Sequence, residues 1–286
     1  MGTSKGYGGP ATGLVPSWVD DPVPGVAPAG PAPAPGAPNL TAPAQPLPGA
    51  PAVPRAPDVS GAGRLGGARG SFSRFARTSS RSALGSALSN YVRNGTGGAR
   101  RAARRMGASR ATGARLLGVV RDVQRFGAAE ALRQLNLPGL AGRPAADVFM
   151  ALLEFVCPPG GAIDEAIARQ AMLETIGDLA ESGVGDFGTM TPDQMQEFFL
   201  DFIARSIEGR VVADLGGRGV TLPDDVAAVE SAQQQLHDFV TGCTRGELSD
   251  RLDGVDRLSD RNIERVVDQI YEAAFELVAA AGEAAK

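Results

Sequence analysis

The chain contains few residue types that could carry out covalent chemistry: one histidine and two cysteines among 286 residues. A histidine acts as a general base when a serine or cysteine nucleophile lies within hydrogen-bonding reach. His237 stands in QQQLHDFV beside Asp238, and no motif pairs it with Cys157, next to two prolines, or with Cys243 in TGCTRGE. We therefore interpret His237 as a structural or surface residue.

Sequence motifs for metal ions and phosphates are absent as well. The histidine and the cysteines lack C-x-x-C or H-x-x-x-H spacing, which argues against a zinc site. The aspartates of ELSDRLDGVDRLSDRN are three and four residues apart, whereas an EF-hand needs acids at alternate positions. DLGGRGV lacks the Lys-Ser/Thr pair of a phosphate-binding loop. We expect no enzyme activity, no metal ion and no bound cofactor.

The arginines form the most pronounced cluster of one functional residue type in the sequence. Fourteen of them lie between Arg64 and Arg125, with a single acid, Asp122. A helix over GARRAARRMG would place four of them close together: Arg100, Arg101, Arg104 and Arg105. Such a cluster can neutralise phosphates and bind nucleic acid without sequence preference, but few aromatic residues accompany it for base stacking. The alternative is that the arginines face the acidic half of the same protein or an acidic partner.

The net charge of −4 hides a strong polarity along the chain. Residues 1–125 carry sixteen basic and four acidic residues, a net charge of +12, and residues 126–286 carry twelve basic and 28 acidic residues, a net charge of −16. This asymmetry indicates an interaction surface without specifying its partner.

Composition also divides the chain into parts. Fifteen of its 21 prolines lie at or before Pro57, in a Pro/Ala/Gly-rich region. This region has almost no large aliphatic or aromatic side chains whose burial could offset the entropy of ordering the chain. We predict a disordered N-terminal tail over residues 1–62, an Arg-rich, partly helical segment over 63–126, and an acidic α-helical domain over 127–286.

Helical periodicity predicts an all-α fold, a helical bundle or array. Residues 61–82 are expected to be only part-ordered, followed by a helix from about Ser82 to Arg93 and a basic helix from about Ala99 to Phe126. Apolar residues at i, i+3, i+4 spacing predict further helices in PAADVFMALLEFVC, at Ile163–Leu179, in TPDQMQEFFLDFIARSI, at Asp224–Phe239 and in SDRNIERVVDQIYEAAFELV. Only GRVVADL and RGVTL hint at strands.

Two of these helices have identifiable starts. Thr191 is the expected N-cap of one, with Pro192 at its first position and Gln194 completing a capping box. Ser259 is the expected cap of the last helix.

Nothing in the sequence directs the chain to a membrane. The first 30 residues lack a basic start followed by an apolar block, and the apolar runs are short and interrupted. Gly6 stands where a myristoylation pattern needs Ser or Thr. We expect a soluble, cytoplasmic protein.

The opening MGTSKGYGGPATGLVPSW resembles the QatB family of bacterial Qat anti-phage systems. The likeness rests on Met1–Ser4, on YGGP at Tyr7–Pro10 and on LVPSW at Leu14–Trp18. It implies a non-enzymatic component of a defence system that also contains an ATPase, a QueC-like enzyme of the QatC type and a TatD-like nuclease, and these three are its implied partners.

The resemblance further implies that the chain is a partner and an N-terminal modification substrate of the QueC-like enzyme. QueC enzymes activate a 7-deazaguanine carboxylate with ATP and pass it to ammonia, and Gly2 would offer an α-amine instead once Met1 is removed. That amine has a reference pKa of about 7.7–8.0, against about 10.4 for Lys5, so far more of it is the free base at neutral pH. The expected partner-binding residues are Gly2, Thr3, Ser4, Tyr7 and Trp18.

Two other roles remain open at the level of sequence. The chain could be a nucleic-acid-binding adaptor that brings a nuclease to phage DNA through its Arg-rich segment. It could also be an unmodified scaffold that docks on a partner through Tyr7 and Trp18.

Overall fold

Ten α-helices and short helical turns form the part of the chain that the computed structural model describes, residues 64–157, 161–216 and 225–286. These residues contain no β-strand, only one isolated bridge between Pro144 and Asp186. The predicted all-α fold is confirmed. The tail predicted at residues 1–62 lies outside the described residues.

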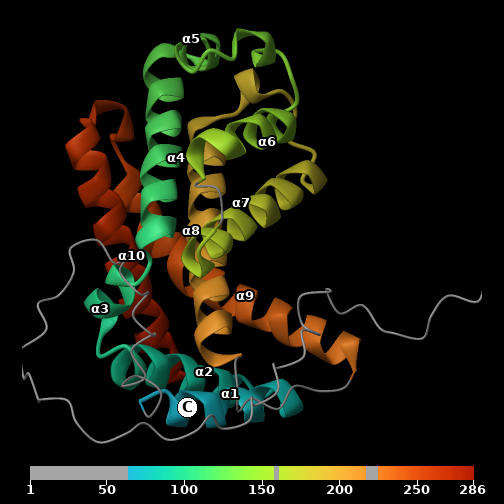
Figure 1. The fold of residues 1–286 in the computed structure, drawn as a ribbon, viewed down its shortest axis with the longest axis vertical. Helices are drawn as coiled ribbons and strands as arrows, with labels where there is room; N and C mark the ends of the chain where they lie inside the picture. Colours follow the sequence, from blue (N-terminus) through green and yellow to red (C-terminus); the bar gives the residue numbers. More distant parts are fainter. Residues whose placement is uncertain (1–63, 158–160, 217–224) are drawn as a thin grey trace, which may run out of the picture. The chain divides into compact units, whose positions relative to one another are not determined.

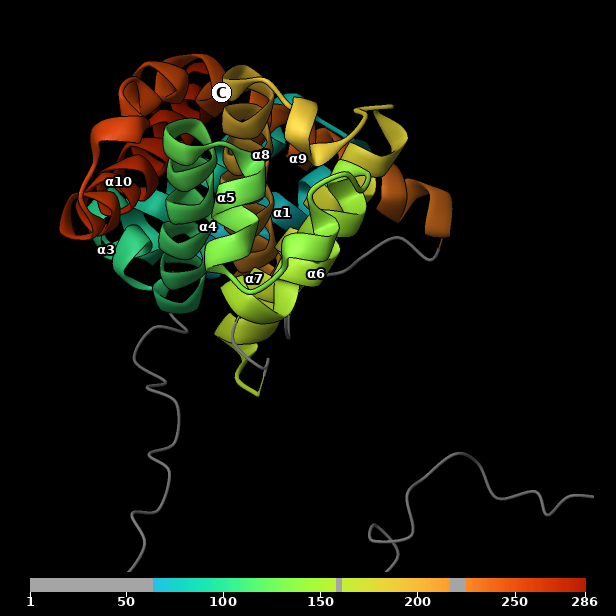
Figure 2. The same ribbon diagram turned by 90° about the horizontal axis from the view of Figure 1, so that it is seen from above.

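Three long helices build the centre: α4 (Gly107–Phe126), α8 (Pro192–Leu215) and α10 (Asp260–Ala284). Helix α4 packs against both α8 and α10 (Figures 1 and 2). The Tyr271 hydroxyl of α10 hydrogen-bonds the Ser206 hydroxyl of α8 at 2.8 Å inside the core. The apolar stripe predicted for α8 is buried in full: Met195, Phe198, Phe199, Phe202 and Ile203.

Two helices cover α8 on another side: α6 (Ala145–Val156), which packs on α7 (Ile163–Glu181), and α7, which packs on α8. The Phe149 ring of α6 stacks on Phe198 with ring centroids 3.9 Å apart, and its edge meets Phe187 at 5.3 Å. A short helix α5 (Ala128–Gln134) and the 3-10 turns Pro138–Leu140 and Phe187–Thr189 complete this region.

Helix α9 (Val226–Ser249) packs on α8 and α10 and is ten residues longer at its C-terminal end than the sequence indicates. The 3-10 turns Asp250–Leu252 and Val255–Arg257 then lead into α10. Gly254 joins these turns with a left-handed φ of 72°. Leu252 and Val255 on either side of this glycine are buried.

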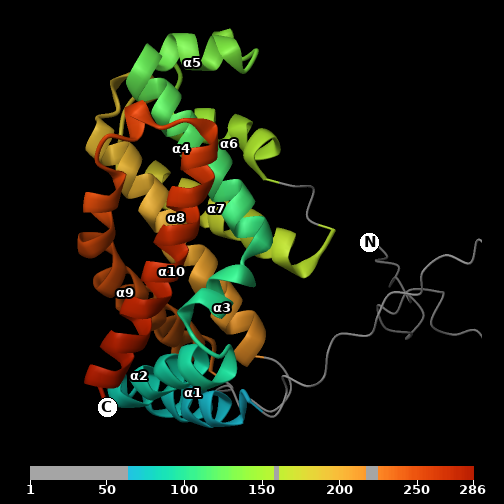
Figure 3. The ribbon, with the colours of Figure 1, turned by 90° about the vertical axis from the view of Figure 1, so that its left-hand side faces the viewer.

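The basic segment forms α1 (Gly66–Thr78), α2 (Arg81–Asn90), a π-helical turn (Tyr91–Gly95) and α3 (Ala99–Arg104). Helix α1 packs on α2, and both α2 and α3 pack on α10 (Figure 3). The expectation that residues 61–82 are only part-ordered is wrong for the described residues from 64 onward. Phe72 and Phe75, too sparse for a helical pattern, are buried and give α1 its packing face.

Two further expectations are corrected. The basic helix expected over Ala99–Phe126 is broken at Arg105 and Met106, where burial of the Met106 side chain favours a change of direction over a continuous helix. GRVVADL is the last part of α8, where Val211 and Leu215, four residues apart, are buried on one helical face. RGVTL lies outside the described residues.

The predicted helix starts are partly confirmed. At the start of α8, Gln194 N–H donates to the Thr191 hydroxyl at 3.2 Å and Thr191 N–H donates to the Gln194 side chain at 2.9 Å, a complete capping box. Ser259 occupies the N-cap position of α10, but its side chain makes no capping hydrogen bond.

Candidate functional site

The structure can be compared with only part of the predicted interaction surface. Gly2, Thr3, Ser4, Tyr7 and Trp18 lie outside the described residues. The arginine cluster is described, and the structure divides its four members into two groups. Arg100, Arg101 and Arg104 are exposed on α3 and have no carboxylate within ion-pair distance among the described residues. Arg105 pairs with Asp214 of α8 at 3.3 Å.

Asp214 is the centre of a cluster that joins the basic helices to the acidic body. Its Oδ2 accepts hydrogen bonds from the Tyr91 hydroxyl at 2.9 Å and from Arg210 Nε at 3.3 Å. Its backbone oxygen accepts from Arg69 of α1 at 3.0 Å. Arg210 also pairs with Asp164 of α7.

Burial makes these contacts of Asp214 significant. The side chains of Asp214 and Arg210 are only 13% and 12% exposed. Burial, followed by the charge of Asp214, raises the pKa of Tyr91, so this phenol stays neutral and donates its proton to the carboxylate. Residues from α1, the π-helical turn, the end of α3 and α8 therefore meet at one residue, Asp214, and α7 joins the cluster through Arg210.

Other arginines of the basic segment also bind the acidic half. Arg110 Nε of α4 donates to Asp268 of α10 at 2.6 Å, and Arg121 Nη1 donates to Asp260 at 2.6 Å. Arg93 pairs with Glu283 at 3.2 Å. The possibility that arginines face the acidic half of the same protein therefore holds for these residues, whereas other exposed arginines, including three on α3, make no ion pair among the described residues.

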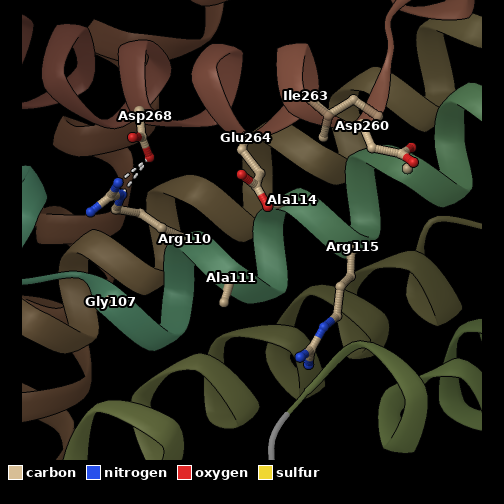
Figure 4. Close-up of a pocket in the computed structure, with 10 residues that line it drawn as sticks. Gly107, Arg110, Ala111, Ala114, Arg115, Asp260, Ile263, Glu264 and Asp268 are labelled. Carbon is tan, nitrogen blue, oxygen red and sulfur yellow. Dashed lines mark hydrogen bonds and ion pairs between the residues drawn. The ribbon is translucent and has the colours of Figure 1, made fainter.

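A groove of about 540 Å³ runs between α4 and α10. Figure 4 shows Arg110 directed to Asp268 and Arg115 directed away toward the opposite side, where Arg115 Nη1 donates to the carbonyl of Val156 at 3.3 Å. Glu264 projects from α10 over the small residues of α4. The two arginines of this groove are thus engaged within the protein.

His237 belongs to a second charged cluster, between α8 and α9. Its Nδ1 lies 2.9 Å from Glu208 Oε1, and its Nε2 lies 3.9 Å from Asp201 Oδ1. Arg205 pairs with Asp201 at 3.0 Å and also with Asp178 of α7. The hydrogen bond to Glu208 raises the pKa of His237, and burial raises the pKa of Glu208. His237 therefore acts as a polar tie between two helices.

We expect this tie to make stability depend on pH. Because the pKa of folded His237 is raised, its contribution is complete below the unfolded value of about 6.5 and is lost as the pH rises through the folded value. The raised pKa of Glu208 has the same sign, because the folded state again holds the proton more tightly. Urea unfolding followed by circular dichroism should give a lower midpoint at about pH 9 than at about pH 6.

His237→Gln is the test variant, because His237 is the one histidine of the chain and glutamine can still hydrogen-bond Glu208. The difference in urea midpoint between the two pH values should shrink in this variant. An unchanged difference would show that other groups carry the pH dependence.

The two thiols have surroundings that keep them protonated. Burial raises the pKa of Cys157 and raises that of Cys243 to about 11. Cys243 donates to the Val240 carbonyl of its own helix at 3.2 Å. Within the described ranges, no group of three or more His, Cys, Asp or Glu side chains could hold a metal ion.

Sequence reasoning missed Asp214, Glu208 and Asp201 as centres of charged clusters. The Arg210–Asp214 and Asp201–Arg205 spacings of four residues on α8 are a readable signal for ion pairs along one helix. Nothing in the sequence shows that Tyr91, Arg105 or His237 reaches the same carboxylates from other helices.

The geometry defines an all-helical protein in which ion pairs and hydrogen bonds, several of them centred on Asp214, hold basic N-terminal helices on an acidic helical body. A comparison with protein families shows which one it is: residues 97–278, more than half of the chain, match the model for the Qat anti-phage system associated protein QatB, and the chain belongs to this family. The resemblance seen in residues 1–18 thus finds support from a separate part of the chain.

Family membership implies that other components of the Qat system are the partners of this chain. Comparisons with curated proteins and with solved structures found no match. No helix in the described part is long and apolar enough to cross a membrane.

Proposed function

We propose that this QatB-family protein is a non-enzymatic component of its anti-phage system and the N-terminal modification substrate of a QueC-like enzyme. The match to the QatB model carries the proposal, because it places the chain in a multi-component defence system. The environments of the candidate groups agree with a non-enzymatic role: His237 is engaged with Glu208, and both thiols are held protonated.

The proposed reaction is amide formation at Gly2. The α-amine of Gly2 attacks the carbonyl carbon of a 7-deazaguanine carboxylate that ATP has activated as an acyl-adenylate. A C–N bond forms, the bond between the carbonyl carbon and the AMP oxygen breaks, and the nitrogen loses a proton. Glycine has no side chain to obstruct this attack, and about a tenth of an ordinary α-amine is the free base at neutral pH.

The test is mass spectrometry of the chain co-expressed with its QueC-like enzyme. Intact mass should show one added acyl group, and peptide spectra should place it on an N-terminal peptide that begins with Gly2. Gly2→Pro should abolish the modification, because proline offers a hindered secondary amine. Lys5→Arg is the matched control and should remain modified, because it removes the one lysine near this terminus.

Two results would refute the proposal: an unmodified Gly2 in cells where the system protects against phage, or an acyl group on Lys5 instead. Full defence by Gly2→Pro would separately show that modification is not required for function.

A further inference from the structure

Helix α3 holds a cluster of arginines in a fixed orientation. Ala102 and Ala103 on one side of this six-residue helix are buried, and α3 packs on α10. The opposite side carries the exposed residues Arg100, Arg101 and Arg104, which we call the α3 arginine face. Three cations are thus presented together on a helix whose other side is anchored in the core.

The turn before α3 adds to this arrangement. Gly97 and Gly98 have φ angles of 79° and 109°, which favour glycine. A Cβ atom on Gly97 would lie 2.9 Å from Arg101 Nη1, so the Arg101 guanidinium rests against the turn.

Ion pairs separate this face from only part of the basic segment. Arg93, Arg105, Arg110 and Arg121 each pair with a carboxylate of the acidic half. Other exposed arginines of the segment, such as Arg74 and Arg77, make no ion pair among the described residues either. The α3 arginine face differs from them because it places three such arginines within five residues of one helix.

Local stability does not explain all of these charges. Arg100 lies in the first turn of α3, where the helix dipole disfavours a cation and no acidic residue is present, whereas Arg101 and Arg104 lie in the last turn. Arg100 and Arg104 are like charges at i, i+4 spacing, which repel each other. An external anionic partner would remove both penalties.

Two features favour a protein carboxylate surface over nucleic acid. The aromatic residues of α1 and of the π-helical turn, Phe72, Phe75 and Tyr91, are buried and cannot stack on bases, and the exposed Phe126 lies at the far end of the 20-residue helix α4. Residues 126–286 carry a net charge of −16, which repels a long phosphate backbone but tolerates a local acidic patch. Arginine also forms two parallel hydrogen bonds with one carboxylate.

We propose that the α3 arginine face is a docking surface for an Asp/Glu-rich patch on another protein of the same anti-phage system. The proposal does not depend on the modification of Gly2. Docking forms arginine–carboxylate pairs at α3, so it weakens as salt concentration rises.

The test measures binding of the purified full-length chain to each of the other Qat components, purified singly, at low and at physiological salt. The variant R100E/R101E/R104E should bind one component at least about tenfold more weakly, a change of about 1.4 kcal/mol. The control R245E/R251E/R261E changes the same number of charges at exposed arginines of other elements and should bind like the wild type. If the charge reversal perturbs folding, R100Q/R101Q/R104Q replaces it in the binding measurement, because this variant removes the charges but keeps polar side chains on α3.

Charge reversal of acidic residues on the affected component should restore binding to R100E/R101E/R104E. Equal binding of all components to the wild type and to both α3 variants would overturn the proposal. Two other results would also overturn it, because each identifies a different occupant of the α3 arginine face. One is binding of a duplex oligonucleotide at physiological salt that the α3 variants lose. The other is a dimer of the chain that dissociates only in the α3 variants.

Discussion

Asp214→Ala is expected to lower the free energy of unfolding by about 3 kcal/mol, the lower end of the cost of breaking a buried ion pair, because Arg210 keeps a second carboxylate. Alanine would leave the Tyr91 hydroxyl without its acceptor and the buried Arg210 with Asp164 as its remaining carboxylate. The junction between the basic helices and α8 would lose its central acceptor. Urea unfolding followed by circular dichroism measures the change.

Two control variants separate the contributions at Asp214. Tyr91→Phe removes one hydrogen bond to a charged group and should cost about 1.5–3 kcal/mol. Arg105→Ala removes a pair whose arginine side chain is 41% exposed, so it should cost about 1 kcal/mol or less. A loss below about 1 kcal/mol for Asp214→Ala would contradict a central role for this carboxylate.

Gly282→Val should destabilise the protein by more than about 2 kcal/mol, because overpacking of a close helix crossing forces backbones apart. A Cβ atom on Gly282 of α10 would lie 2.6 Å from the backbone oxygen of Gly85 on α2, and one on Gly85 would lie 2.7 Å from the oxygen of Gly282. Backbone atoms cannot rotate away as a side chain can, so α2 and α10 must separate.

The matched pair for this crossing is Gly282→Ala and Gly177→Ala, measured by urea unfolding. Gly177 on α7 has open space around an added Cβ atom, so alanine should stabilise there by up to about 1 kcal/mol through helix propensity. Gly282→Ala gains the same propensity but meets the Gly85 oxygen, and should be net destabilising. Stabilisation at both positions would show that the crossing accommodates a methyl group.

The Asp214 junction connects parts of the chain that the family match divides, whereas Gly85 and Gly282 both lie outside the matched residues. The QatB match covers residues 97–278, which include α3, α8 and most of α10. Helices α1 and α2 precede it, yet Arg69 and Tyr91 bind Asp214 inside it. Loss of the Asp214 junction or of the Gly85–Gly282 crossing should therefore loosen α1 and α2 before the acidic body, because the body retains its own core of α4, α6, α7 and α8.

The fold was predictable where helices are long and clearly amphipathic. Helices α6 and α7 appear close to the expected bounds, and the capping box at Thr191 starts α8 as its residues indicate. Helices α8 and α10 begin where expected but run eight and six residues further at their C-terminal ends. The prediction of helices failed where the local sequence is rich in Gly, Ser and Arg. Helix α1 forms because Phe72 and Phe75 pack on α2, a contact that a single-helix pattern does not contain.

The candidate sites divide in the same way. The sequence identified a cluster of four arginines and the charge polarity around it. It could not separate Arg105, which binds Asp214, from the three arginines that remain on the surface of α3. It also could not show that His237 meets Glu208, 29 residues away along the chain.

By itself, the sequence determined the helical class, most helix positions, the family resemblance and the excess of arginine before residue 126. These features depend on periodicity, caps and composition, which act over a few residues of one segment. Only the tertiary structure decided which charges are neutralised inside the protein and which face outward. Charges pair across a few ångströms of space, and packing between helices sets those distances independently of separation along the chain.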